Sequence, residues 1–163
     1  LCRHHVGDRW FVDETYVRVG GVLRYVYRCV DQHGQVIDVF VSKRRNTAAA
    51  RRFFGTVLGA HGRPVEVTTD LAAPLLRVVD EVLFNVAHDT EQYANNRVET
   101  DHGRLKARLR PMRGLKRDPS ASVVIRGHAF IQNLRRGHYE LGVNARTHHL
   151  RVAAAFDELA EAI

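Results

Sequence analysis

Cysteine is scarce in this sequence, and its scarcity excludes two kinds of domain. Only Cys2 and Cys29 are present, and no Cys-x-x-Cys spacing occurs. A small secreted domain held by disulfides and a zinc ribbon both need more cysteines in tighter patterns. We therefore expect a protein of a reducing cytoplasm.

Long apolar runs and a methionine start are also missing. No stretch of about 18 apolar residues is present to span a bilayer, and the opening LCRHHVGDRW lacks the apolar core of a signal peptide. These absences predict a soluble, unexported protein that does not contact a membrane. Because the sequence begins at Leu1 and its single methionine is Met112, we also expect a fragment or trimmed copy of a longer protein.

Acidic residues are outnumbered by basic ones. Among 163 residues, 25 Lys and Arg stand against 18 Asp and Glu, which gives a net charge of +7 and an isoelectric point near 10.0. Such an excess concentrates polyanions around a protein, so nucleic acid is the leading candidate partner. The apolar share of 45% is typical of a globular chain, and the length fits one compact domain.

The hydrophobic pattern predicts an α/β domain. Alternating apolar residues indicate strands at 10–19, 23–31 and 35–42, which short glycine-containing turns join into an antiparallel meander. Helical spacing and short apolar runs then alternate along the chain. We expect helices at 46–62, 75–84, 95–109, 120–138 and 150–163, and strands at 65–69 and 85–90. A meander followed by this alternation favours a mixed sheet with flanking helices.

Three carboxylates stand in unusual places, although most acidic residues of a protein are solvated surface charges. Asp13 lies inside the first apolar strand, Asp70 directly follows the fourth, and Glu99 lies on the third predicted helix. If the fourth strand runs beside the first, Asp13 and Asp70 approach each other, and a helix packed across that edge brings Glu99 to them. Carboxylates this close repel one another unless hard cations neutralise them. We therefore predict a site for Mg²⁺ or Mn²⁺, with two ions about 3.5 to 4 Å apart, an arrangement used for phosphodiester chemistry.

Basic residues follow Glu99 along the same predicted helix. Lys106 lies seven residues later, about two turns along and on nearly the same face. A cation there is suited to hold a DNA phosphate near the metal ions, and Arg104, Arg108 and Arg110 extend the basic stripe. The alternative, a basic helix that is simply solvated, fits the charge pattern equally well.

Three further titratable residues lie next to Asp13 or close to Glu99 in the sequence, and the pattern predicts where each points or what it contacts. Asp101 is the rival of Glu99, but it lies about 200° further round the helix. Glu14 follows Asp13 directly, so on a strand it points to the opposite face. His102 lies three residues from Glu99, where it either contacts a DNA phosphate or metal-bound water, or makes a hydrogen bond within the protein.

Five stretches carry a family resemblance, in this order along the chain: WFVDETYVRVGG, YVYRCVDQHGQVIDVFVSKRRNTAAARRFF, VTTD, TEQYANNRVETDHGRLKARLRPMRGLK and GHAFIQNLRRG. Together they resemble the catalytic core of bacterial insertion-sequence transposases with an Asp-Asp-Glu triad, in particular the insertion-sequence family numbered six. The resemblance spans residues 7–143. It implies an RNase H-like fold with a mixed five-stranded sheet, divalent metal ions, and transfer of 3′-hydroxyl ends into target DNA. It also implies double-stranded DNA partners at element ends and target, a homodimer or larger assembly, and a place at the nucleoid in the bacterial cytoplasm.

The family's functional residues match this chain position by position. Asp13 in VDETY matches the first aspartate, Asp70 in TTD the second, and Glu99 in NNRVETDH the glutamate. Lys106 matches the basic residue that the family places seven positions after the glutamate. The resemblance therefore implies that the three carboxylates are both the catalytic residues and the metal ligands.

The family's paired asparagines fall on Asn95 and Asn96, which orient DNA or cap the start of the helix.

The chain departs from the family pattern in three ways. The second aspartate is commonly followed by Lys-Ala, with Ala-Tyr shortly after, whereas this chain reads DLAAPL from Asp70. Only 28 residues lie between positions 70 and 99, fewer than usual for such triads. We also expect the N-terminal helix-turn-helix region of the family to be absent.

The sequence thus predicts a transposase catalytic domain at 1–143, followed by a helical tail at 144–163. Its predicted reaction is cleavage and joining of DNA at insertion-sequence ends by two-metal phosphoryl transfer. Two alternatives remain open. One is a truncated, catalytically inactive remnant that binds DNA or dimerises, and the other is a ribonuclease of the same fold.

Overall fold

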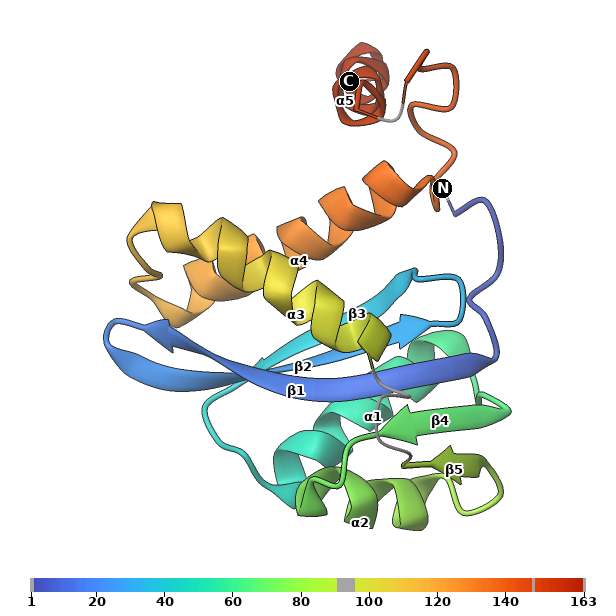
Figure 1. Ribbon diagram of the computed structural model, residues 1–163, viewed down its shortest axis with the longest axis vertical. Helices are drawn as coiled ribbons and strands as arrows, with labels where there is room; N and C mark the ends of the chain where they lie inside the picture. The colour runs from blue at the N-terminus through green and yellow to red at the C-terminus, as the bar shows by residue number, and fades with distance from the viewer. Residues whose placement is uncertain (1, 91–95, 148, 163) are drawn as a thin grey trace.

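A five-stranded mixed sheet forms the centre of the protein, with helices on both faces (Figure 1). The computed structural model describes residues 2–90, 96–147 and 149–162. The strand order is β3-β2-β1-β4-β5, in which β1 to β3 form the predicted antiparallel meander and β1, β4 and β5 run parallel. The strands are β1 (Arg9–Val19), β2 (Val22–Asp31), β3 (Val36–Ser42), β4 (Glu66–Thr69) and β5 (Ala87–Asp89).

The helices form two layers against this sheet. In Figure 1, α1 and α2 cover one face, α3 and α4 cover the other, and α5 lies beyond α4. The helices are α1 (Thr47–His61), α2 (Ala73–Val82), α3 (Asn96–Leu109), the short 3₁₀ helix η1 (Arg110–Met112), α4 (Asp118–Arg136) and α5 (Arg151–Glu161). Within the described ranges, no helix has the length and apolar character needed to cross a membrane.

The ends of α1 follow the sequence signals. The Asn46 side chain accepts a hydrogen bond from the Ala49 N–H at 2.9 Å, which satisfies one of the free donors at the helix start. Gly62 then ends the helix with φ of 78°, a left-handed value that favours glycine. The predicted helix at 46–62 is thereby confirmed.

Two other helices begin earlier than predicted. Pro74 lies in the first turn of α2, and Pro119 lies in the first turn of α4. Proline is tolerated there because the first N–H groups of a helix have no partner within the helix. The sequence interpretation started each helix after its proline, and this was wrong by two residues in both cases.

Two hydrophobic cores lie on opposite faces of the sheet. Phe53 and Phe54 of α1 pack with Trp10 and Val12 on one face. On the other face, the buried side chains of α3 and α4 pack against the sheet, and Phe11 adjoins them. Because side chains alternate along a strand, Asp13 falls on the same face as Phe11. The first candidate carboxylate therefore points toward the layer of α3 and α4.

A buried ionic cluster fixes α3 on the sheet. Asp101 of α3 is 1% exposed and lies between two arginines, Arg28 of β2 and Arg136 of α4. Arg28 Nη1 lies 3.3 Å from Asp101 Oδ2, and Arg136 Nη1 lies 3.3 Å from the same oxygen. Arg136 also donates to the Gly34 carbonyl and to Asp101 Oδ1. We call these three charged residues the Asp101 cluster.

The cluster holds two positive charges and one negative charge. Burial lowers the pKa of Arg28, while the charge and hydrogen bonds of Asp101 oppose that shift. Removing a buried charge from its partner leaves an uncompensated charge in a region of low dielectric. Asp101 is therefore expected to be far more important for stability than a carboxylate paired with arginine at the surface.

We expect Asp101→Ala to lower the free energy of unfolding by about 3 kcal/mol, because it leaves Arg28 buried without its carboxylate. The matched control is Asp118→Ala, which removes a carboxylate 2.7 Å from Arg24 at the surface. Urea unfolding followed by circular dichroism measures both variants. Equal losses would contradict the assigned importance of the cluster.

Candidate active site

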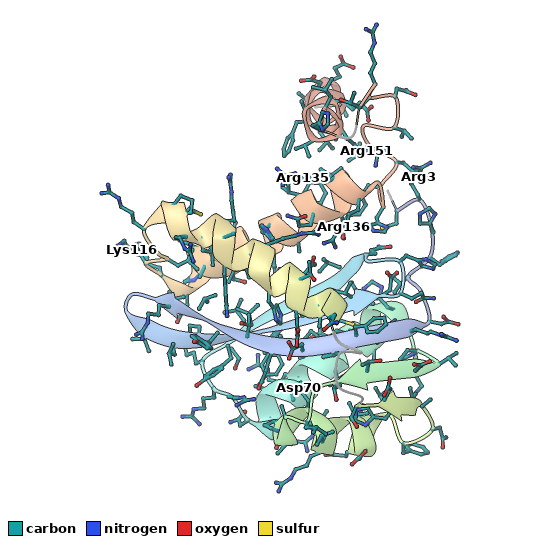
Figure 2. The ribbon with its side chains drawn as sticks, viewed as in Figure 1. Arg3, Asp70, Lys116, Arg135, Arg136 and Arg151 are labelled. Atoms are coloured by element: carbon teal, nitrogen blue, oxygen red, sulfur yellow. The ribbon has the colours of Figure 1, made fainter. Side chains whose placement is uncertain are left out.

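Parallel pairing of β1 with β4 brings the first two carboxylates together. Val12 is the register partner of Thr69, so Asp13 and Asp70 are the next residues on the two adjacent strands. Asp13 continues within β1, whereas Asp70 directly follows the end of β4 (Figure 2). The fourth strand thus runs beside the first, which is the condition on which the expected approach of Asp13 and Asp70 depended.

Asp13 is held from two sides. It is 8% exposed, and its Oδ1 accepts a hydrogen bond from the Glu14 N–H at 2.7 Å. Its Oδ2 lies 3.4 Å from Nδ1 of His102. The carboxylate orientation therefore depends on the backbone of β1 and on a side chain of α3.

Asp70 has a perturbed acidity. Partial burial is the main cause that raises its pKa, and the negative charge of Asp13 raises it further. A hydrogen bond from the Ala72 N–H to Asp70 Oδ1, at 3.1 Å, and the positive charge of Arg45 oppose the rise. Asp13 is therefore close enough to Asp70 to raise the pKa of the Asp70 carboxyl.

Glu99 lies in the first turn of α3 and is exposed. Its helix crosses β1 on the face to which Asp13 points (Figure 1). Among the described residues, no three His, Cys, Asp or Glu side chains gather closely enough to hold a metal ion. The structure thus pairs Asp13 with Asp70, and it places Glu99 on the helix that touches Asp13 without completing a three-carboxylate cluster.

His102 is the contact between α3 and Asp13. The residue is 5% exposed, and its Nε2 atom is buried with no hydrogen-bond partner among the described residues. Of the two roles that the sequence left open, this position favours a contact within the protein. His102 is one helical turn after Glu99, so the same contact also sets where α3 lies relative to the two aspartates.

One side of α3 carries Glu99 and, seven residues later, the exposed Lys106. Four residues after Lys106, the exposed Arg110 begins η1, directly after the end of α3. The Lys106 ammonium lies 4.9 Å above the ring centre of Tyr16, which is 57% exposed. A cation over an aromatic face is attracted by the ring. Lys106 is thereby held beside β1 while its charge remains available to solvent.

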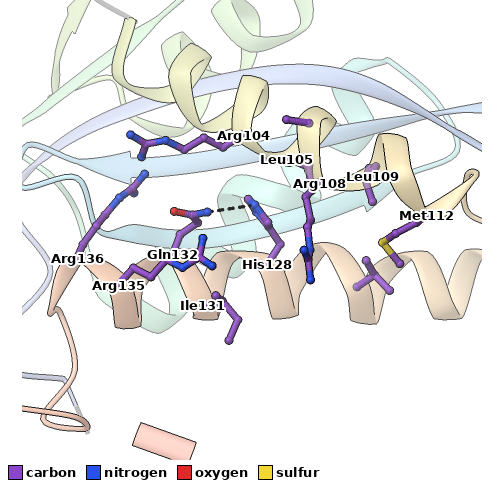
Figure 3. Close-up of a pocket in the computed structure, with 12 residues that line it drawn as sticks. Arg104, Leu105, Arg108, Leu109, Met112, His128, Ile131, Gln132, Arg135 and Arg136 are labelled. Atoms are coloured by element: carbon purple, nitrogen blue, oxygen red, sulfur yellow. Dashed lines mark hydrogen bonds between the residues drawn. The ribbon is translucent and has the colours of Figure 1, made fainter. Parts of the chain in front are cut away.

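The other predicted DNA-binding residues do not all lie on the Glu99 side of α3. Arg104 and Arg108 lie about half a turn round α3 from Glu99 and face α4 (Figure 3). Asn96 is the exposed first residue of α3, and its carbonyl accepts a hydrogen bond from the Thr100 hydroxyl at 2.8 Å. Asn95 lies outside the described residues.

The rival carboxylates have structural partners. Asp101 belongs to the buried cluster with two arginines, and Glu14 pairs with Arg45 on the face opposite Asp13. Sequence reasoning missed Arg45, whose charge also reaches Asp70. The run SKRRN between β3 and α1 was the available signal, because it concentrates cations just before a helix. Leu71, where the family commonly has lysine, is 73% exposed.

In the metal-free chain, we expect Asp13→Asn to lower the pKa of Asp70 part of the way toward its ordinary value. The substitution removes the repulsion from Asp13, whereas burial, the larger cause of the shift, remains. Titration of the Asp70 carboxyl carbon by nuclear magnetic resonance measures the change. Asp80→Asn, at an exposed position of α2, is the control, and an unchanged Asp70 in the Asp13 variant would contradict the proximity.

Known proteins resemble this chain in sequence. The transposase for the insertion sequence-like element IS431mec of Staphylococcus aureus is 32% identical over 105 residues. The matched region is 61% of this chain and 47% of that protein. The chain therefore spans about half the length of the curated relatives it matches.

Solved structures resemble it in fold. The catalytic core of HTLV-2 integrase, solved with magnesium in a dimeric form, has a TM-score of 0.59 at 17% identity, over 80% of this chain and 90% of that one. A simian T-cell lymphotropic virus intasome in complex with a PP2A regulatory subunit gives a TM-score of 0.61 at 17% identity, over 91% of this chain and 55% of that one. These likenesses confirm the predicted RNase H-like fold.

A family model described as a DDE domain matches residues 7–138, which is most of the sequence. The match contains β1 to β5, all three candidate carboxylates and the whole of α3 and α4. Together with the transposase relatives, it establishes that this chain belongs to the DDE domain family of transposases.

Proposed function

We propose that this chain is the catalytic domain of a transposase that cuts and joins DNA at the ends of an insertion sequence. The observation that carries the proposal is the pair Asp13 and Asp70 on adjacent parallel strands, with the helix of Glu99 in contact with Asp13 through His102. The family match and the relatives named as transposases support it, and they favour an enzyme over an inactive remnant.

The donor set of Asp13, Asp70 and Glu99 fits a divalent cation. Carboxylate oxygens are the ligands that Mg²⁺ and Mn²⁺ prefer, and the raised pKa of Asp70 reflects burial and repulsion by Asp13, which a cation would counteract. We propose that these three residues hold two such ions. When bound, the ions supply activation of an attacking oxygen and stabilisation of the leaving oxygen in phosphodiester chemistry.

The chain's own residues would position the reacting groups. The Glu14 N–H and His102 hold the Asp13 carboxylate, and the Ala72 N–H holds that of Asp70. The proposed reaction has two steps. Water first attacks a phosphodiester to free a 3′-hydroxyl at the element end, and that hydroxyl then attacks a phosphodiester of the target DNA in line.

Double-stranded DNA would lie along the Glu99 side of α3. Lys106 follows Glu99 on that side, the exposed Arg110 lies just beyond the helix in η1, and Asn96 is exposed at the start of the helix. Phosphate contacts from such cations fix the register of a DNA strand without reading its sequence. Arg104 and Arg108 face α4 instead, so the proposed DNA path does not include them.

Strand transfer with a pre-cut 3′-hydroxyl DNA end and Mn²⁺ tests the assignment. We expect Asp13→Asn, Asp70→Asn and Glu99→Gln each to lower the rate about a thousandfold, because several kcal/mol of transition-state stabilisation are lost. Asp80→Asn is the control. Calorimetric titration of Mn²⁺ gives a second readout, in which the triad variants lose binding.

The same experiment separates the alternatives. Metal-dependent joining that survives in Asp13→Asn would overturn the assignment of Asp13. A wild-type chain that binds duplex DNA in a salt-sensitive way, but neither binds Mn²⁺ nor joins ends, would support the inactive remnant. Cleavage of the RNA strand in RNA–DNA hybrids without joining would support a ribonuclease.

Salt dependence tests the proposed DNA path. We expect Lys106→Ala to weaken binding to every duplex and to reduce the slope of log affinity against log salt by about 1, because one phosphate contact is lost. Arg104→Ala, two residues away on the other side of α3, is the matched control and leaves the slope unchanged. A larger effect of Arg104→Ala than of Lys106→Ala would contradict the proposed path, because it would place the DNA on the side of α3 that faces α4.

A further inference from the structure

A groove of about 850 Å³ opens between α3 and α4, on the side of α3 away from Glu99 (Figure 3). Arginines from both helices border it, Arg104 and Arg108 from α3 and Arg135 and Arg136 from α4. Apolar side chains lie between them, including Met112, Val124 and Ile131. We call this feature the α3–α4 groove.

The groove is positively charged at neutral pH. Arg104 and Arg136 approach the carboxylate of Asp101, whereas Arg108 and Arg135 are exposed at its border. His128 lines the groove, and burial, followed by the charge of Arg28, lowers its pKa to about 4, so that it is neutral at pH 7. An occupant that matches the groove therefore needs an apolar ridge with carboxylates beside it.

A DNA backbone matches this lining poorly. Phosphates would satisfy the arginines, but they would leave Met112, which is 46% exposed, and the apolar residues of α4 beside them uncovered. A groove with an apolar floor and charged borders is instead typical of sites that bind an amphipathic helix. The lining favours an acidic helix over nucleic acid.

The chain itself carries such a helix. In α5, Ala155 is fully buried against the rest of the protein, while Phe156 is 50% exposed. Asp157 and Glu161 are exposed and lie one turn apart, beside Phe156 on the outer side of the helix. The outer side of α5 therefore combines an aromatic residue with two carboxylates, which complements the groove in both apolar character and charge.

The lengths also agree. The 11 residues of α5 span about 16 Å. The groove extends from Arg104 in α3 to Met112 in η1, about 12 Å, and along α4 from Val124 to Arg136, about 18 Å. One helix of the size of α5 fills it.

The α5 helix of the same chain is held elsewhere. It packs against α4 and lies beyond it, apart from α3 (Figure 1), and the Gly142 N–H donates to Glu158 at 3.0 Å. No described residue of the same chain thus covers the outer side of α5 or fills the groove. A second copy of the chain satisfies both, because a two-fold axis lets each copy give its helix and receive its partner's.

We propose that the α3–α4 groove is an interface between two copies of this chain, each of which inserts the outer side of its α5 helix into the groove of the other. Apolar contact of Phe156 with the groove and pairing of Asp157 and Glu161 with Arg108 and Arg135 stabilise the dimer. The reciprocal exchange doubles the buried area relative to a single helix in a single groove. Neither metal nor DNA takes part, so this inference stands or falls separately from the proposed catalysis.

Charge reversal tests the interface by light scattering and sedimentation across a range of protein concentrations. The groove variant carries Arg108→Glu with Arg135→Glu, and the helix variant carries Asp157→Arg with Glu161→Arg. Alone, each places like charges together at both contacts, and we expect its dimer dissociation constant to rise at least about tenfold. Mixed in equal amounts, the two variants form a heterodimer, because opposite charges then meet at both contacts.

The mixture distinguishes two cases. If α5 docks into the groove of another copy, mixing the two variants restores the dimer; if α5 docks into the groove of its own chain, mixing restores nothing. Circular dichroism verifies that each variant is folded. Arg44→Glu with Arg77→Glu, on the segment before α1 and on α2, makes the same charge change elsewhere and leaves the dimer intact. We expect Phe156→Ala, which leaves every charge in place, to weaken the dimer. Phe84→Ala, at an exposed phenylalanine after α2, leaves the dimer unchanged. A monomeric wild-type chain, or a mixture that stays monomeric, would overturn the proposal.

Discussion

Parallel pairing between β1 and β4 is the constraint on which the candidate active site depends. Two strands, β2 and β3, and the helix α1 lie between them in the chain, yet the register of Val12 with Thr69 puts Asp13 beside Asp70. A shift of one residue would turn Asp13 to the other face of the sheet. The two cores help to fix that register, because β1 buries Trp10 and Val12 in one core and Val17 and Val19 in the other, and β4 buries Val67 beside Trp10 and Val12.

Helix α3 presents a different set of residues on each of its sides. Val98 and Leu105 are fully buried against the sheet. Glu99 and Lys106 lie along an exposed side near the aspartates, and Arg104 and Arg108 face α4. With 3.6 residues per turn, one short helix can serve packing, the proposed active site and the proposed dimer surface without conflict. The position of that helix is therefore the common condition for all three tasks.

The sequence predicted what depends on local pattern. Alternation in WFVDETYVRV and the Asn46 cap are readable from neighbouring residues. The antiparallel meander followed from such local patterns, and the mixed five-stranded sheet followed from them and from the family resemblance. The Asp101 cluster was not predicted, because Arg28 and Arg136 are 73 and 35 residues away from it along the chain. The α3–α4 groove was likewise beyond reach, since it depends on how side chains of two helices pack rather than on which residues they contain.

Because of the Asp101 cluster, the position of α3, and with it the candidate active site, depends on a residue that is translated late. A ribosome produces Asp13, Asp70 and Glu99 well before it produces Arg136 of α4, which supplies the second arginine around Asp101. A domain generally folds as a unit, and α3 gains its last buried ion pair only when α4 is present. A chain that ends before α4 thus contains Asp13, Asp70 and Glu99, but it lacks the second arginine that pairs with Asp101 and fixes α3 on the sheet.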